Sequence, residues 1–188
     1  MKKIMFLMFA VLMSINAMAA GELLFVKSGN ASVLKEAATS TFAVDYSNVK
    51  INDLTLEGYA QTRKDNDFME NYVKDMANGG KQFAKRFSSK SKTFKFDNKA
   101  SGKYVTTFNI ESMDMGNFAV GMFSLKKGQG GIGLAGDIVV KDASTGETVL
   151  VLRVDNVKGL IDFSESSRIQ SAFDELAKAV VNMVKKLK

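Results

Sequence analysis

A long amphipathic segment closes the chain and limits the folds that are open to it. Its apolar residues recur at helical spacing and form one stripe: Ile169, Phe173, Leu176, Val180, Val184 and Leu187. Asp162 and Glu165 stand three residues apart, as in a capping box at the start of a helix, and lysines near the C-terminus suit the negative end of the helix dipole. A helix with one apolar stripe must bury it, so we predict that residues 162–188 form a helix packed on a sheet.

The segments before this helix alternate between apolar and polar residues, which predicts strands. The segment 149–154 is apolar on both faces apart from Arg153, so we expect it inside the sheet. Asp142 and Gly146 bound a hairpin turn, because Asp starts turns and Gly accepts positive φ. The predicted strands are 22–27, 41–46, 48–56 with a turn at 52–53, 104–111, 118–122, 132–140 and 149–154.

A second helical region precedes most of these strands. Phe68, Tyr72 and Met76 recur every four residues, and Phe83 and Phe87 resume that spacing after a pair of glycines at 79–80. The pattern allows two helices, or one helix broken at the glycine pair. We therefore predict an α+β fold: a two-layer sandwich in which helices pack on one face of a mainly antiparallel sheet.

The N-terminus has the three parts of a secretory signal peptide. Lys2 and Lys3 precede an apolar run of ten residues, Ile4 to Met13, and Ala17 and Ala19 supply the small residues that a signal peptidase needs. The run is about half as long as a membrane-spanning helix, so a membrane anchor is disfavoured. We predict a signal peptide over 1–20, a single domain over 21–188, and export to the periplasm or the medium.

The composition excludes several classes of chemistry. The chain has no His and no Cys, which removes Ser-His and Cys-His nucleophile pairs and His-based metal sites. The net charge of +6 falls by two when Lys2 and Lys3 leave with the signal. We therefore predict no enzymatic activity, no cofactor, no metal, no nucleic-acid partner and no transmembrane segment after cleavage. A carboxylate-only hydrolase using Asp137, Asp142 or Asp155 remains as an alternative.

A basic tract follows the second helical region's glycines. Its members are Lys81, Lys85, Arg86, Lys90, Lys92 and Lys95, with phenylalanines between them. Such a mixture can bind polyanions, of which anionic lipid or glycan suits an exported protein. The simpler interpretation is that the phenylalanines face the core and the lysines face water.

A glycine-rich turn is the other candidate site, at Gly128, Gly130, Gly131 and Gly133. The letters match the dinucleotide fingerprint, but that site needs a helix to follow, and alternating strand residues follow here. The remaining interpretations are a flexible turn, or a backbone that approaches a partner chain closely.

The second half of the chain resembles a known family. The segments Tyr104–Ile110, Gly136–Glu147 and Ala172–Lys178 are similar to those of exported domains of the TolB N-terminal and curli-secretion lipoprotein type. The resemblance implies a closing helix across the sheet and an envelope role in assembly or transport, without catalysis. The lipoprotein cysteine of that family is missing here. We therefore expect a non-catalytic binding or assembly module of the bacterial cell envelope, with another envelope protein or a second copy as its partner.

Overall fold

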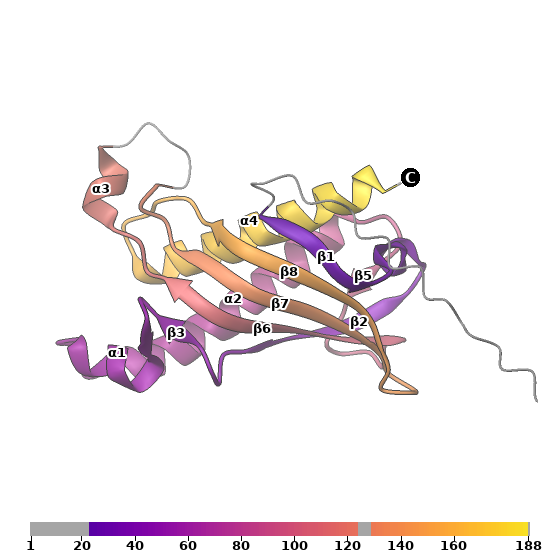
Figure 1. Ribbon diagram of the computed structural model, residues 1–188, viewed down its shortest axis with the longest axis horizontal. Helices are drawn as coiled ribbons and strands as arrows, with labels where there is room; N and C mark the ends of the chain where they lie inside the picture. The colour runs from indigo at the N-terminus through magenta and orange to yellow at the C-terminus, as the bar shows by residue number, and fades with distance from the viewer. Residues whose placement is uncertain (1–22, 124–128, 188) are drawn as a thin grey trace, which may run out of the picture.

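The computed structural model describes residues 23–123 and 129–187 (Figure 1). The predicted signal peptide over 1–20 and Gly128 of the glycine-rich turn lie outside these residues. The strands are β1 (Leu24–Gly29), β2 (Thr39–Asp45), β3 (Lys50–Ile51), β4 (Leu54–Thr55), β5 (Lys95–Phe96), β6 (Tyr104–Asp114), β7 (Gly133–Asp142) and β8 (Thr148–Lys158). The helices are η1 (Ala31–Lys35, a 3-10 helix), α1 (Leu56–Thr62), α2 (Phe68–Lys90), α3 (Phe118–Met122) and α4 (Glu165–Lys186).

One sheet holds all the strands, in the order β1-β8-β7-β6-β2-β5, with β3 beside β6 beyond the end of β2 and β4 beside β3. The pairs from β1 to β6 are antiparallel, and so is the short β3–β4 pair, whereas β2 runs parallel to β5 and β6, and β3 runs parallel to β6. The β7–β8 hairpin closes as its sequence predicts, because Asp142 accepts hydrogen bonds from the backbone of Ser144 and Thr145, and Gly146 has φ 72. The predicted mainly antiparallel sheet is confirmed.

The two long helices, α2 and α4, lie side by side across one face of the sheet (Figure 1). They run in the same direction: Ser166, at the start of α4, donates to Asp75, about two turns into α2, and Arg86 donates to Asp174 about three turns further along α2 and two turns further along α4. The apolar stripe of α4 is buried from Ile169 to Val180, as predicted, and partly buried at Val184 and Leu187; the N-cap is Ser164 rather than Asp162. The α+β sandwich with helices on one face is therefore observed, and the C-terminal ends of both helices meet at one end of the molecule.

The glycine pair at 79–80 does not interrupt α2, which continues over 23 residues. A Cβ on Gly79 would lie 2.2 Å from Cδ2 of Phe173, a fully buried ring of α4. Glycine therefore lets the two helices approach closely at this point. Both alternatives predicted from the sequence, two helices or one broken helix, are wrong.

The prediction of a strand over 118–122 is wrong, because these residues form the short helix α3. Gly116, with φ 64, turns the chain out of the line of β6. The backbone N–H of Gly121 then donates to the carbonyl of Asn117, which closes one helical turn. An alternation of apolar residues over five positions does not distinguish these two outcomes.

An aromatic cluster fills the space between α2 and the β2–β5 edge of the sheet. Phe42 stacks on Phe83 with ring centroids 4.3 Å apart, and Phe96 meets Phe87 edge-on at 5.1 Å. Phe87 and Phe94 are almost completely buried. These rings fix the C-terminal turns of α2 against the sheet.

The opposite face of the sheet carries a charge network. Arg153 donates to Glu111 at 2.6 Å and to Asp137 at 3.2 Å, and Lys27 pairs with Asp137 at 2.6 Å. Over the part of the chain that the structure covers, no helix has the length and apolarity to cross a bilayer.

Candidate binding site

The C-terminal ends of α2 and α4 enclose a hollow of about 330 Å³, together with η1 and the loop after α2. Its floor is apolar and consists of Leu34, Phe87, Val181 and Val184. Its rim carries four lysines: Lys35, Lys90, Lys92 and Lys185. We call it the lysine-rimmed pocket. Its volume lies at the small end of the range of about 300–1,000 Å³ that is usual for small-molecule sites.

Each part of the floor is set by a neighbouring element. Phe87 belongs to the aromatic cluster and is 1% exposed, so its ring position is fixed by packing. Val181 and Val184 lie in the last two turns of α4, where Val181 is buried and Val184 is partly buried. Leu34 arrives from η1, whose start is capped by the side chain of Asn30.

Two lysines at this end of the molecule cap helix carbonyls. Lys95 donates to the carbonyls of Ser88 and Ser91 at 2.6 and 2.5 Å, at the C-terminus of α2. Lys35 donates to the carbonyl of Leu187 at the C-terminus of α4. Parallel helices place two negative dipole ends together, and these two cations already serve them.

The other three lysines of the rim, Lys90, Lys92 and Lys185, are exposed. None of them forms an ion pair with a residue that the structure describes. The lining contains no carboxylate from the described ranges. A concave surface lined by one sign of charge over an apolar wall focuses its field on an approaching counter-ion. The arrangement can therefore hold an anion.

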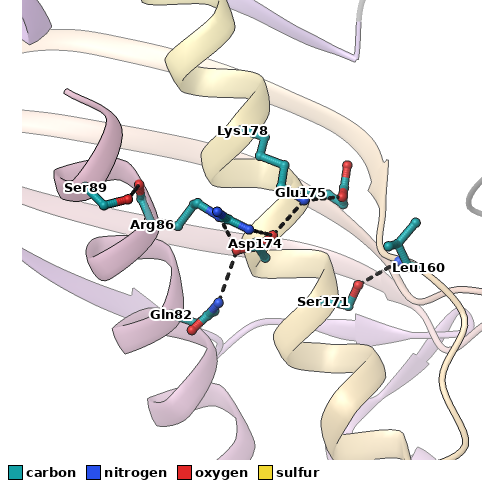
Figure 2. Close-up of polar contacts among 8 residues, drawn as sticks. All are labelled: Gln82, Arg86, Ser89, Leu160, Ser171, Asp174, Glu175 and Lys178. Carbon is teal, nitrogen blue, oxygen red and sulfur yellow. Dashed lines mark hydrogen bonds and ion pairs between the residues drawn. The ribbon is translucent and has the colours of Figure 1, made fainter.

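Arg86, a member of the predicted basic tract, forms an ion pair that joins α2 to α4 (Figure 2). Its guanidinium donates to both carboxylate oxygens of Asp174, at 2.6 and 3.0 Å. Gln82 and Lys178 contact the same carboxylate at 3.1 and 2.8 Å. Burial raises the pKa of Asp174, but the hydrogen bonds from Arg86, Lys178 and Gln82 outweigh it and bring the pKa to about 2.

The structure thus divides the basic tract. Lys90 and Lys92 line the lysine-rimmed pocket, whereas Lys81 and Lys85 are exposed elsewhere on α2 and Lys95 caps that helix. The phenylalanines of the tract face the core, as in the simpler interpretation of the sequence. Polyanion binding by the tract stays a prediction.

Sequence reasoning missed half of the pocket. Leu34 and Lys35 come from a short helix in a segment without a clear pattern, and Lys185 was interpreted only as a partner of the helix dipole. The available signal was the surplus of lysine at the end of the α4 stripe, but only the fold brings it beside Lys90 and Lys92.

The described part of the glycine-rich turn leads from α3 into β7, so a strand follows it and not a helix. A Cβ on Gly131 would lie 2.0 Å from the carbonyl oxygen of Gly159, and one on Gly133 would lie 2.1 Å from Oδ1 of Asn156. Gly130 has φ 81. Gly131 and Gly133 therefore allow close approach to the chain's own β8–α4 region, and binding by the turn stays a prediction.

A second hollow, of about 390 Å³, lies at the opposite end of the sheet and carries charges of both signs. Asp53, Asp114 and Asp155 line it together with Lys50. Burial raises the pKa of Asp114, but the backbone N–H of Gly116 and the ammonium of Lys158 hold it below its usual value. Among the described His, Cys, Asp and Glu side chains, no group of three or more could hold a metal ion.

The three carboxylates named from the sequence do not form one group. Asp137 is paired with Lys27 and Arg153 on the open face of the sheet, and Asp155 lines the second hollow. Asp142 lies six residues along β7 from Gly136, the partner of Val154, which corresponds to about 20 Å. Glycoside hydrolysis needs two carboxylates about 5–9 Å apart, so Asp142 and Asp155 cannot serve as such a pair.

No family model matches the chain, and no curated protein sequence matches it. Among solved structures, the chain is similar to the PelC dodecamer from Paraburkholderia phytofirmans in two crystal forms. A point variant in space group C2 aligns with a TM-score of 0.41 and 11% identity over 84% of this chain and 95% of that chain. The form in space group P6 aligns with a TM-score of 0.44 and 12% identity over 83% and 96%. Neither likeness assigns a family or a function to this chain, and the resemblance to TolB-type domains stays a prediction.

Proposed function

We propose that this chain is an exported, non-catalytic binding module that holds an anionic ligand in the lysine-rimmed pocket. The observation that carries the proposal is the set of three surplus lysines, Lys90, Lys92 and Lys185, around an apolar floor with no carboxylate among the lining residues described. Like charges at short range repel each other, and an anion relieves that repulsion when it binds. The composition supports a non-catalytic role, because the chain has no His and no Cys.

The experiment compares two triple variants that change the net charge equally. One replaces Lys90, Lys92 and Lys185 by Gln, and the other replaces the exposed lysines 50, 64 and 141, which lie outside the basic tract, by Gln. The probes are vesicles of phosphatidylglycerol in phosphatidylcholine and, separately, dextran sulfate, with pure phosphatidylcholine vesicles as the uncharged reference. Cosedimentation measures the vesicles, and isothermal titration calorimetry measures the polysaccharide.

We expect the pocket variant to lose binding and the matched variant to keep it. Each lysine close to an anionic surface contributes about 1 kcal/mol, so the three together account for about a 100-fold change in affinity. If neither probe binds at low salt, or if the two triple variants bind alike, the proposal fails.

Export is the other part of the proposal, and it rests on the order of charges and apolar residues before Ala20. N-terminal sequencing of the protein recovered from the periplasm should begin at Ala20 or Gly21. An intact Met1 on protein from the cytosol would contradict export. Association with an envelope protein or with a second copy stays a prediction, which sedimentation velocity and crosslinking in the periplasm would measure.

A further inference from the structure

The apolar floor of the lysine-rimmed pocket restricts the chemical class of the ligand more than its charged rim does. The four floor residues are aliphatic or aromatic, and they come from three elements: η1, α2 and α4. The aliphatic stems of the rim lysines add to this apolar wall, because lysine keeps its charge in water while its methylenes lie along apolar surface. A ligand that fits must therefore join a negative head to an apolar body.

A glycan finds few partners in this pocket. Ser91 and Thr93 carry its only hydroxyl groups among the described lining residues. The hydroxyl of Thr93 already donates to the carbonyl of Lys35 at 2.7 Å. Hydroxyl groups of a sugar placed on this floor would lose their hydrogen bonds to water without replacement, which is costly.

The size of the pocket limits the apolar body to one chain. At about 330 Å³ the hollow lies at the small end of ligand sites, and it is bounded on both sides by helices that packing holds in place. The rim lysines stand at its mouth, where a head group would remain in contact with water.

We propose that the lysine-rimmed pocket binds an anionic lipid with a single aliphatic chain, its phosphate or carboxylate head at Lys90, Lys92 and Lys185 and its chain on the floor of Leu34, Phe87, Val181 and Val184. This inference rests on the proposed function and specifies the ligand of the same site. Charge complementarity places the head, and the apolar floor places the chain.

Calorimetry with inorganic phosphate and with butyl, hexyl, octyl and decyl phosphate tests the inference on the signal-free chain. Burial of each methylene changes the dissociation constant about fourfold. We expect the dissociation constant to fall by that factor for each added methylene and then to level off once the hollow is full. The triple glutamine variant at Lys90, Lys92 and Lys185 should weaken every member of the series by a similar factor.

A filling variant separates the chain from the head. Val184→Phe places a ring in the hollow and leaves all rim lysines in place, and Val184 is only partly buried, so the fold can tolerate the change. Val73→Phe, at a position of α2 that is 47% exposed, is the matched control. We expect Val184→Phe to abolish the dependence on chain length while Val73→Phe retains it, with thermal unfolding confirming that both are folded.

The outcomes distinguish this inference from the function on which it rests. Equal affinities along the alkyl series, or a chain-length dependence that Val184→Phe leaves intact, overturn the single-chain lipid. If dextran sulfate still binds through the rim lysines in that case, the anion-binding module stands with a different ligand. If no anion binds through those lysines, the proposed function itself fails.

Discussion

The contact between α2 and α4 differs between its middle and its C-terminal end. In the middle, Gly79 of α2 packs directly against the ring of Phe173 of α4, and Arg86 is paired with Asp174. At the end, the same two helices leave the lysine-rimmed pocket between them, and three of its lysines have no ion-pair partner within the described ranges. The middle uses its charges to join the helices, whereas the end presents surplus charge to solvent. In a basic tract, the cations that form ion pairs within the fold should therefore be separated from those that do not, because only the second group is available to a ligand.

The largest effect is expected from enlarging the middle of the contact. Gly79→Val would push side-chain atoms into the ring of Phe173. Even a Cβ alone would lie only 2.2 Å from Cδ2 of that ring, so there is no free space for a larger side chain. Overpacking of this kind costs about 3 kcal/mol of the free energy of unfolding. Urea denaturation measures the loss, and Asn78→Val, at an exposed neighbouring position of α2, is the control that should stay within about 0.5 kcal/mol of the natural chain. Equal stabilities of the two variants would show that the middle is not tightly closed.

The next effect comes from the ion pair in the middle. Asp174→Asn removes the charge that Arg86 and Lys178 contact and should cost about 2 kcal/mol at neutral pH. The pKa of Asp174 is about 2 in the folded chain, below its usual value of about 3.9. The stabilisation is therefore complete above about pH 5 and is lost as the pH falls toward 2.

Urea unfolding of Asp174→Asn at several pH values checks this sign. The stability gap between the natural chain and the variant should be constant from pH 7 to about 5 and shrink below about pH 4. Glu70→Gln is the matched control, because Glu70 pairs with Lys74 on the surface, where both side chains are more than half exposed. Its cost should stay below about 0.5 kcal/mol. A gap that does not change with pH would contradict the assignment of Asp174.

The same contrast separates the features that could be predicted from the sequence from those that could not. The α4 stripe and the alternation of β6 to β8 predict the α+β sandwich, because period and burial are local properties of the chain. The role of Gly79 is not local: glycine normally weakens a helix, and only the position of Phe173, far along the chain, explains why it is here. The pocket is hidden for the same reason, since its floor and rim come from segments around 34, 90 and 184 that only the fold brings together.

A smaller effect of opposite sign is expected at the open end. Val184→Phe enlarges a residue of α4 as Gly79→Val enlarges one of α2, but here a hollow receives the added atoms. Filling a surface hollow with apolar atoms should raise the free energy of unfolding by about 0.5 kcal/mol. Urea denaturation of Val184→Phe beside Val73→Phe measures it. A loss comparable to that of Gly79→Val would mean that the end is as tightly closed as the middle.

The smallest effect on stability is expected from the rim. Replacing Lys90, Lys92 and Lys185 by Gln weakens the favourable electrostatics at the negative ends of two helix dipoles, but it also removes repulsion between the three cations. Lys35 and Lys95 continue to cap the helix carbonyls in this variant, so the helix ends keep their main partners. The free energy of unfolding should therefore change by less than about 0.5 kcal/mol, as measured by urea denaturation at low salt. A loss of more than about 1 kcal/mol would show that these lysines belong to the fold, as Arg86 does, and the contrast between the two parts of the contact would disappear.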